Sequence, residues 1–324
     1  MAKGFGRPVP NTHNEREAQI LKKSVLNHFE HRSVPRVGSR TDHNFVAIVT
    51  IAILAVIAGA DGFVAIETYG KAKQQWLETF LDLPHGIPSH DTFGRVFGQL
   101  APQQLEAGFL SWVGSITESL DIELIHIDGK TAKGSYDRKN YHLALHSVSA
   151  WSSEYGLVLA QQKVESKSNE ITAVPLLLKL LNLFGAVVTL DAMGTQIDIA
   201  RQILQAGGDY VLALKGNQGK LSQQVAGWFA IAQAMNWQGI ELSDHQTVEA
   251  SHHRKETRQV WAVGVSQLPP LLDRAQWEGL TSVVMVKRTR QLWNMGHHPD
   301  SVLPQFPVGG WLAAQPGDSL PLGC

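Results

Sequence analysis

Cysteine is nearly absent from this sequence. The single cysteine among 324 residues, Cys324, stands at the last position. One thiol excludes an intramolecular disulfide framework, and it excludes a zinc site built from several thiolates. A reducing compartment is the natural setting for such a chain, so we expect a cytoplasmic protein.

An excess of charge of either sign is also missing. The formal net charge is -1, so the chain as a whole exerts no attraction on a polyanion such as DNA. Any nucleic-acid binding must therefore come from local basic patches set against acidic surface elsewhere. Composition alone does not indicate a DNA-binding protein.

A secretory signal and long apolar runs are lacking too. The first residues, MAKGFGRPVPNTHNERE, contain no apolar core followed by a small-residue cleavage site. The apolar run from Phe45 to Ala60 is shorter than the roughly 20 residues that a membrane-spanning helix requires. We therefore predict a buried helix over this run and no membrane partner.

The sequence does contain enough apolar material for a large core. With 44% hydrophobic and 18% charged residues, it can form one large domain or two smaller ones. Residues 1 to about 40 are polar, and apolar residues then recur with 3.6-residue spacing to about residue 118. This pattern predicts an α-helical N-terminal domain over 1–118, in which Pro88 and Ser89 are placed to begin one helix.

Beyond residue 122 the pattern changes to short strands. Apolar stretches and alternation predict three consecutive strands, over 123–128, 141–151 and 155–164. Ser168 is placed to cap a helix over 170–184, and a helix over 196–206 then separates strands over 185–191 and 209–216. This βββαβαβ order is the layout of a ribonuclease H-like α/β fold, a mixed sheet flanked by helices. Fold order alone does not determine function.

Two aspartates stand at the ends of apolar strands. Asp128 directly follows the stretch 124–127, and Asp191 directly follows 186–190. If the first and fourth strands are neighbours, the two carboxylates face each other, and a magnesium ion between them would relieve their repulsion. Two metals at such a site can activate a water or a 3′-hydroxyl and stabilise the leaving oxygen of a phosphodiester. The alternative is that each aspartate merely ends a strand or begins a turn, as Asp-Gly often does.

Several longer motifs occur in a fixed order. They are HIDGKTAKGS, LHSVSAW, KSNEITAVPLLL, LDAMGTQ and YVLALKGNQ, preceded by an apolar helix and GIPSHDTFGRVF. Together they resemble the H-repeat-associated (Rhs element) type of insertion-sequence transposase, a member of the DDE superfamily. The resemblance implies a DDE domain over 119–290 that cleaves element ends and transfers the strand, in DNA transposition and recombination. It also implies Mg²⁺ or Mn²⁺ as cofactor and double-stranded DNA, both element ends and target, as partner. The implied location is the bacterial cytoplasm, at the nucleoid. Assembly into a homo-oligomer is left open.

The resemblance assigns roles to the two aspartates. Asp128 of IDGK and Asp191 of LDAMG match the first two acids of the DDE triad, which implies that they hold the catalytic metal. Four further residues match motif positions without an assigned role: Lys130, Lys215, Asn217 and Gln218.

Basic and amide side chains near these motifs are candidates for DNA contact. They are Lys130 and Lys133 after the first acid, Lys215 and Asn217 after the last predicted strand, and Arg254 and Arg258 in the basic segment SHHRKETRQVWAV. Each of them can equally be an ordinary solvated side chain. Adjacent histidines on a strand point to opposite faces, so we reject a zinc site at His252 and His253.

The third acid of the triad is missing. Related transposases carry it in a pattern like Arg-x-His-Trp-x-Ile-Glu, and the resemblance stops after Arg288. The tail over 291–324 is rich in proline and glycine without a clear period, so we expect it to be out of frame or disordered. A frameshift between about Asn294 and Val302 would explain the loss and predicts a weak or inactive enzyme. Glu256 is the fallback candidate for the third acid.

Two other functions stay open from the residues. One is a non-catalytic remnant that binds DNA or mixes with full-length transposase subunits. The other is an unrelated ribonuclease H-like nuclease, which would cleave without preference for inverted-repeat ends.

Overall fold

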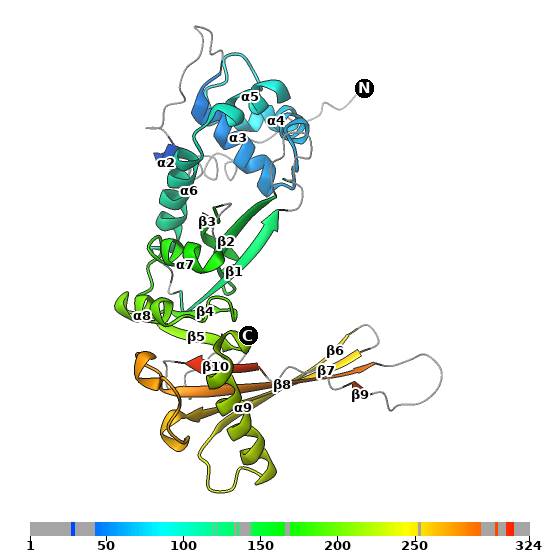
Figure 1. Cartoon of the computed structure of the whole chain (residues 1–324). Helices are drawn as coiled ribbons and strands as arrows, with labels where there is room; N and C mark the ends of the chain where they lie inside the picture. The colour runs from blue at the N-terminus through cyan, green and yellow to red at the C-terminus, as the bar shows by residue number, and fades with distance from the viewer. Residues whose placement is uncertain are drawn as a thin grey trace. The chain divides into compact units, whose positions relative to one another are not determined.

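A computed structural model describes the chain in two compact units, Met1–Leu120 and Asp121–Cys324 (Figure 1). The residues described are 27–29, 43–118, 120, 122–132, 135, 144–165, 169–251, 254–292, 302–303 and 309–313. Lys133 and the His252–His253 pair lie outside them.

The described part of the first unit consists of helices. They are α2 (Asn27–Phe29), α3 (Phe45–Ile57), α4 (Phe63–Leu77), α5 (His90–Gln99) and α6 (Pro102–Thr117). The predicted buried helix over the apolar run is α3, which ends before Gly59, whose φ of 97° favours glycine. The predicted helix start at Ser89 is confirmed, because the Ser89 hydroxyl accepts a hydrogen bond from the Thr92 N–H of α5. Among the residues that the structure describes, no helix has the length and apolar character to cross a bilayer.

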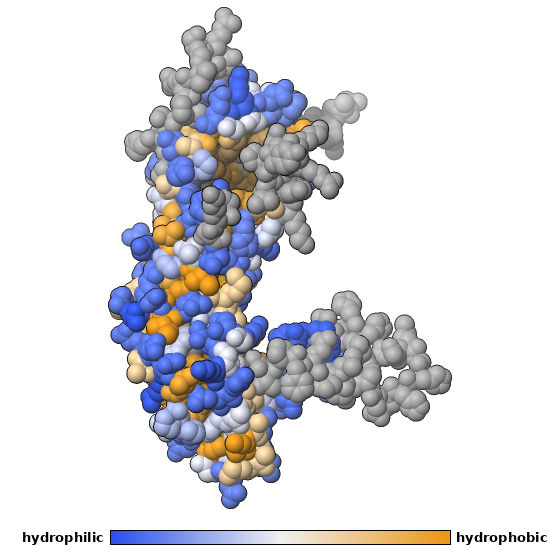
Figure 2. All heavy atoms as spheres, in the orientation of Figure 1, coloured by the Kyte–Doolittle hydropathy of each residue, from blue (hydrophilic) through white to orange (hydrophobic). Residues whose placement is uncertain are grey.

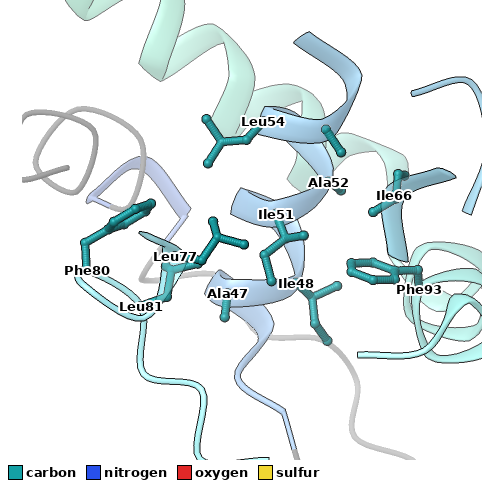
Figure 3. Packing of buried hydrophobic residues seen from close by; sticks show 11 residues of the cluster. Ala47, Ile48, Ile51, Ala52, Leu54, Ile66, Leu77, Phe80, Leu81 and Phe93 are labelled. Carbon is teal, nitrogen blue, oxygen red and sulfur yellow. The ribbon is translucent and has the colours of Figure 1, made fainter. Parts of the chain in front are cut away.

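The core of this unit gathers around α3. Ile51 lies at its centre and is fully buried, and Leu77 and Phe93 approach from α4 and α5 (Figure 3). Because apolar burial is the dominant favourable contribution to folding, this contact set stabilises α3, α4 and α5 as one packed group.

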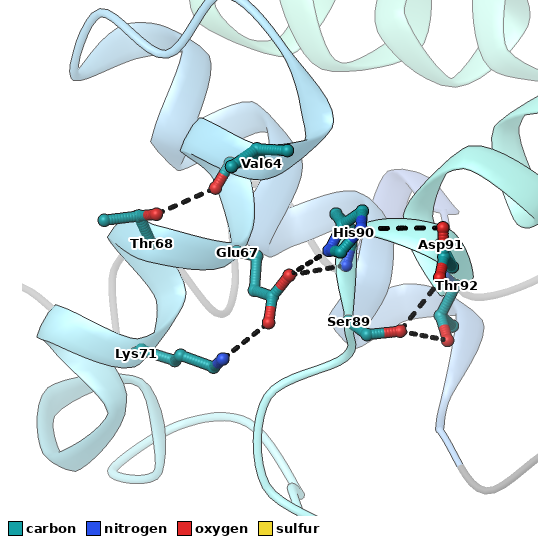
Figure 4. Close-up of polar contacts among 8 residues, drawn as sticks. All are labelled: Val64, Glu67, Thr68, Lys71, Ser89, His90, Asp91 and Thr92. Atoms are coloured by element: carbon teal, nitrogen blue, oxygen red, sulfur yellow. Dashed lines mark hydrogen bonds and ion pairs between the residues drawn. The ribbon is translucent and has the colours of Figure 1, made fainter.

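A polar contact also joins α4 to the start of α5. The Glu67 carboxylate accepts hydrogen bonds from Lys71 on the same helix and from the His90 backbone N–H at 2.8 Å, and it lies 2.6 Å from His90 Nδ1 (Figure 4). These hydrogen bonds, that from Lys71 first, lower the pKa of Glu67 to about 2.

The second unit contains the mixed sheet. Its elements are β1 (Leu124–Ala132), β2 (Leu145–Ser152), β3 (Leu157–Lys163), α7 (Glu170–Leu178), β4 (Val187–Leu190), α8 (Ile197–Gln205), β5 (Asp209–Leu214), η3 (Gly216–Gln218), α9 (Gly219–Ala234), β6 (Ser243–Ser251), β7 (Arg254–Gly264), η4 (Val265–Gln267), η5 (Arg274–Gln276), β8 (Ser282–Leu292), β9 (Val302–Leu303) and β10 (Gly309–Ala313). The predicted βββαβαβ order is confirmed from β1 to β5.

The sheet runs in the order β3-β2-β1-β4-β5-β10-β8-β7-β6, with β9 paired to β8. Strands β1, β4 and β5 are parallel neighbours, whereas the other pairs are antiparallel. Helix α7 packs on β2 and β3, and α8 packs on β5 and α7. The strands β6, β7 and β8 extend to the right of Figure 1. The carboxyl ends of β1, β4 and β5 therefore lie along one edge of the sheet.

Several details differ from the sequence expectations. Strand β1 continues to Ala132, so Asp128 lies within it and does not end it. The residue that caps α7 is Asn169, whose side chain accepts from the Thr172 N–H, and Ser168 lies outside the described residues. Helix α7 ends at Leu178 rather than at residue 184, after a proline at position 175. The tail beyond residue 290 contributes β10, which pairs with β5 and β8 inside the sheet, so this part of it has regular structure.

Candidate active site at the edge of the mixed sheet

The two candidate aspartates lie side by side in register. Strands β1 and β4 are parallel, and Ile127 pairs with Leu190 at the end of their shared ladder. Asp128 and Asp191 are the next residues along each strand, and both are exposed. The expectation that the first and fourth strands are neighbours is confirmed, and it brings both carboxylates to the same edge of the sheet.

Asp191 begins a tight turn after β4. Its Oδ1 accepts hydrogen bonds from the backbone N–H of Met193 at 2.9 Å and of Gly194 at 3.2 Å. The buried Thr195 hydroxyl lies 2.6 Å from the Ala213 carbonyl oxygen, to which it donates, and 3.2 Å from the Asp191 carbonyl oxygen. Because both hydrogen bonds use Oδ1, the turn fixes the orientation of the Asp191 carboxylate without using Oδ2.

Two amide side chains that follow β5 donate hydrogen bonds to the backbone of this turn. Asn217 Nδ2 donates to the Ala192 carbonyl oxygen and, at 3.4 Å, to that of Thr195. Gln218 Nε2 donates to the same Thr195 oxygen at 3.2 Å. Asn217, a candidate for DNA contact from the sequence, therefore has a structural contact, and the two amides link the KGNQ segment to the LDAMGTQ segment.

A second network supports the strand that carries Asp128. His146 Nε2 donates to Glu170 Oε1 at 2.7 Å, and the other ring nitrogen lies 2.8 Å from the Thr131 hydroxyl. A Cβ built on Gly129 would lie well inside van der Waals contact with the Glu170 carboxylate. Glycine at this position therefore lets the start of α7 approach β1 directly beside Asp128.

His126 joins β1 to β4 two residues before Asp128. Its ring nitrogens lie 2.7 Å from the Thr189 hydroxyl and 3.1 Å from the Ser153 hydroxyl. Burial lowers the pKa of His126 below its usual value, because the charged ring would lose solvation. A neutral His126 is thus a strand-joining residue rather than a source of positive charge at the site.

The basic candidates are only partly placed by the structure. Lys130 on β1 and Lys215 after β5 are exposed. Arg254 is the first residue of β7, but its side chain is outside the described residues. Arg258 lies on the same strand, which is separated from β1 by β4, β5, β10 and β8.

Glu256 on β7 is not brought together with the two aspartates. At about 4.8 Å between neighbouring strands, the five steps from β1 to β7 amount to roughly 24 Å. The side chain is 5% exposed and contacts Arg258 at 2.8 Å, Arg288 at 2.6 Å and Arg290 at 3.4 Å. The hydrogen bond from Arg288 contributes most to lowering the pKa of Glu256 to about 2. An anion already paired with arginines is a poor metal ligand, so this geometry speaks against the fallback role.

The donor chemistry at the aspartate pair fits magnesium or manganese. Both ions prefer oxygen ligands, and Mg²⁺ is often held by one or two carboxylates together with waters and substrate phosphates. In the part of the chain that the structure describes, no group of three or more His, Cys, Asp or Glu side chains is arranged to hold a metal. A metal at the two aspartates would therefore take its remaining ligands from water or substrate.

Comparison with known proteins gives these features a family. Residues 119–288 match the family described as Transposase DDE domain, and residues 26–113 match the one described as DDE_Tnp_1-associated. The chain belongs to the DDE transposase family. Its match to the DDE domain runs from just before β1 to Arg288 and so includes both aspartates.

Individual relatives agree with this assignment. The "Uncharacterized protein in dhlA 3'region" of Xanthobacter autotrophicus is 42% identical over 77% of this chain and 83% of its own length. The "Putative transposase YncI" of Escherichia coli O157:H7 is 41% identical over 79% of this chain, a match that spans 65% of that protein. The "H repeat-associated putative transposase YhhI" of E. coli K12 is 35% identical over 83% of this chain and 70% of its own length. The resemblance to H-repeat-associated transposases is thereby confirmed.

Sequence reasoning missed the residues whose contacts support the turn and the strand that carry the two candidate aspartates. Glu170 and Thr195 lie within motifs that were singled out, but a sequence gives no sign that Glu170 contacts Gly129 or that Thr195 bonds to β5. Arg288 and Arg290 were missed because their partner, Glu256, lies on another strand.

Proposed function

We propose that this chain is a DNA-binding transposase polypeptide in which Asp128 and Asp191 hold a divalent metal for phosphodiester chemistry. The observation that supports this most is their register on the parallel strands β1 and β4, because it brings two exposed carboxylates to one edge of the sheet. Insertion-sequence ends and target duplex are the proposed DNA partners.

The strand order supports a ribonuclease H-like fold for the DDE domain. Three antiparallel strands, β3-β2-β1, continue into the parallel strands β4 and β5, with α7 and α8 as the connecting helices. In open α/β sheets, ligands bind beyond the carboxyl ends of the parallel strands. Asp191 follows the end of β4, and Asp128 follows the end of the ladder that β1 shares with β4. The helical residues before β1 would then form a separate N-terminal domain.

Each residue of the site has a proposed task. Asp128 and Asp191 would provide carboxylate oxygens for Mg²⁺ or Mn²⁺, and the bound metal would activate the attacking hydroxyl and stabilise the leaving oxygen of the phosphodiester. Thr195, Asn217 and Gln218 would keep the Asp191 turn in place. The exposed Lys130 and Lys215 would contact DNA phosphates.

The proposed activity of this polypeptide on its own is weak or absent. Its sequence contains no segment of the Arg-x-His-Trp-x-Ile-Glu kind, and Glu256 is bound by three arginines. With two of the three acids, the chain would bind metal and DNA better than it cleaves. The second candidate function, a non-catalytic remnant that occupies element ends or mixes with full-length subunits, is favoured by the same observation. Either form would work in the bacterial cytoplasm at the nucleoid.

A cleavage and binding assay tests the proposal. Labelled duplexes with the inverted-repeat ends that flank the encoding gene are compared with random duplexes, with and without Mg²⁺. We expect specific binding of the end-bearing duplex and only slow, Mg²⁺-dependent nicking. Equal handling of both duplexes would contradict a transposase and would favour an unrelated nuclease.

Variants of the two aspartates separate the two candidate functions. Asp128→Asn and Asp191→Asn should each abolish any nicking and leave DNA binding intact, whereas Asp244→Asn, an exposed aspartate on β6, should change neither. Nicking that survives in both site variants would refute the role of the pair. Binding without nicking in the unsubstituted chain would favour the remnant.

A further inference from the structure

Three arginines surround one buried carboxylate on the strands β7 and β8. Arg258 comes from β7, Arg288 and Arg290 come from β8, and all three contact Glu256. We call these three arginines with Glu256 the arginine cluster. In Figure 2 a small hydrophilic region is visible at the base of the part that extends to the right, where β7 and β8 lie in Figure 1.

The cluster carries more positive charge than its carboxylate needs. Three guanidinium groups face one buried carboxylate, and Glu249, which is 3.8 Å from Arg258, is itself 67% exposed. Each guanidinium has five N–H donors, whereas one carboxylate has about four acceptor sites. The guanidinium donors therefore outnumber the acceptor sites of Glu256, and the surplus charge favours a second anion.

The buried Glu256 carboxylate also holds the arginine side chains in position before that anion binds. The side chains of Arg288 and Arg258 are 44% and 37% exposed, so they reach solvent while Glu256, at 5%, does not. Holding a guanidinium in place before binding reduces the side-chain entropy that binding would otherwise cost. A planar guanidinium matches a phosphate through two parallel hydrogen bonds, so a phosphate is the anion that suits this arrangement.

The strand register places the cluster at the same edge of the sheet as the aspartate pair. Asp128 and Asp191 are level with Ala213 on β5, which pairs with Trp311 on β10, which in turn pairs with Val284 on β8. Because β10 is antiparallel to both neighbours, β8 runs parallel to β5. The chain of β8 therefore continues beyond this row in the same direction as the carboxyl ends of β1 and β4.

The cluster also lies on the same face of the sheet as Asp128. Residues paired across neighbouring strands point to the same face, and along a strand the faces alternate. Val284 shares the face of Asp128, and Arg288 and Arg290 lie four and six residues farther along β8, so they share it too. On β7, Arg258 pairs with Arg288 and has the same orientation.

We propose that the arginine cluster binds a backbone phosphate of the DNA duplex that lies across the aspartate pair. The proposal rests on the proposed function, and it names the contact that holds the duplex at a distance from the site of chemistry. Four strand steps separate β1 from β8, which amounts to roughly 19 Å. One polynucleotide strand of a DNA duplex that lies along this edge of the sheet covers that distance.

The test compares two neighbouring cations on β8 that point to opposite faces. Arg288→Gln removes one guanidinium of the cluster, while Lys287→Gln removes an exposed charge from the other face. Binding of an end-bearing duplex to the full chain is measured by fluorescence anisotropy over a series of salt concentrations. Circular dichroism melting of each variant identifies any loss of folding, and Arg258→Gln provides an independent variant from β7.

Loss of one phosphate contact has a defined signature. The slope of log K against log salt should become shallower by about 0.9 in Arg288→Gln, and affinity at 0.1 M salt should fall about eightfold. Lys287→Gln should change neither quantity by a comparable amount. Equal effects of the two variants would overturn the proposal while leaving the proposed function intact. Absence of DNA binding by the unsubstituted chain would overturn both.

A free phosphate ion is the other source of the same ligand chemistry. In that case inorganic phosphate would raise the melting temperature of the unsubstituted chain and not of Arg288→Gln, while the DNA salt slopes of the two proteins would agree. This outcome would overturn the assignment to DNA.

Discussion

Replacing Gly129 by alanine tests the packing beside Asp128. A Cβ on Gly129 would lie 2.7 Å from Glu170 Oε2 and closer still to Oε1, so the Glu170 carboxylate has to move. Movement of this carboxylate breaks the 2.7 Å hydrogen bond from His146. Since Gly129 lies in a strand without a positive φ, the backbone itself accepts alanine.

The change in stability that Gly129→Ala should cause follows from two opposing contributions. A hydrogen bond to a charged group contributes about 1.5–3 kcal/mol, and the lower half of that range applies here because both side chains are partly exposed. Alanine in place of a strand glycine stabilises by about 0.4–1 kcal/mol through the unfolded state. Gly129→Ala should therefore destabilise β1 by about 1 kcal/mol.

The effect of Gly129→Ala on stability should change sign when the Glu170 side chain is removed. In a Glu170→Ala background the hydrogen bond is already absent, and the three atoms nearest to the added Cβ are removed, so Gly129→Ala should stabilise by about 0.4–1 kcal/mol. Amide hydrogen exchange of β1 peptides, followed by mass spectrometry, measures both steps in the full chain. Additive destabilisation in the double variant would refute the reasoning, because it would mean that Glu170 does not occupy the space above Gly129.

Other substitutions test separate parts of the structure. Phe93→Ala removes a fully buried ring from the first unit and should lower its unfolding free energy by about 3–5 kcal/mol, seen as an earlier transition in calorimetry. Thr195→Val keeps the shape but leaves the buried Ala213 carbonyl without this donor, at a cost of about 1–3 kcal/mol in urea unfolding, and Thr195→Ser should restore most of it. The pKa of Glu67 in the folded chain is lowered to about 2, so the stabilisation that its carboxylate provides is present above about pH 4.5 and is lost as the pH falls toward 2. Glu67→Gln should flatten this part of the acid-unfolding curve. An unchanged curve would contradict the contact.

Local patterns in the sequence predicted the order of elements from β1 to β5. Apolar runs and alternation depend on neighbouring residues, so they are visible without a structure. Strand β10 was not predicted, because the sequence GGWLA has no alternation and its pairing with β5 and β8 depends on register across a long sequence separation. The cap of α7 was placed one residue too early, at Ser168 instead of Asn169.

For the candidate site, too, local sequence features were predicted and contacts between distant residues were not. Asp128 and Asp191 were identified because each directly follows an apolar stretch. The pairing of β1 with β4 confirms that both stand next to the end of one parallel ladder, although β1 itself continues to Ala132. Glu256 was considered as a third acid because it stands in a basic segment that resembles a motif of the family. Its arginine partners on β8 lie more than thirty positions away, so no local pattern reveals that its charge is already paired.

The central claim is that Asp128 and Asp191 hold a divalent metal, and Mn²⁺ binding to the full chain tests it most directly. Isothermal titration calorimetry on the unsubstituted chain should detect a Mn²⁺ site whose affinity falls roughly tenfold or more in Asp128→Asn and in Asp191→Asn. Asp244→Asn should bind like the unsubstituted chain, since Asp244 lies on β6, away from the pair in the strand order. Unchanged Mn²⁺ affinity in both site variants would contradict the claim.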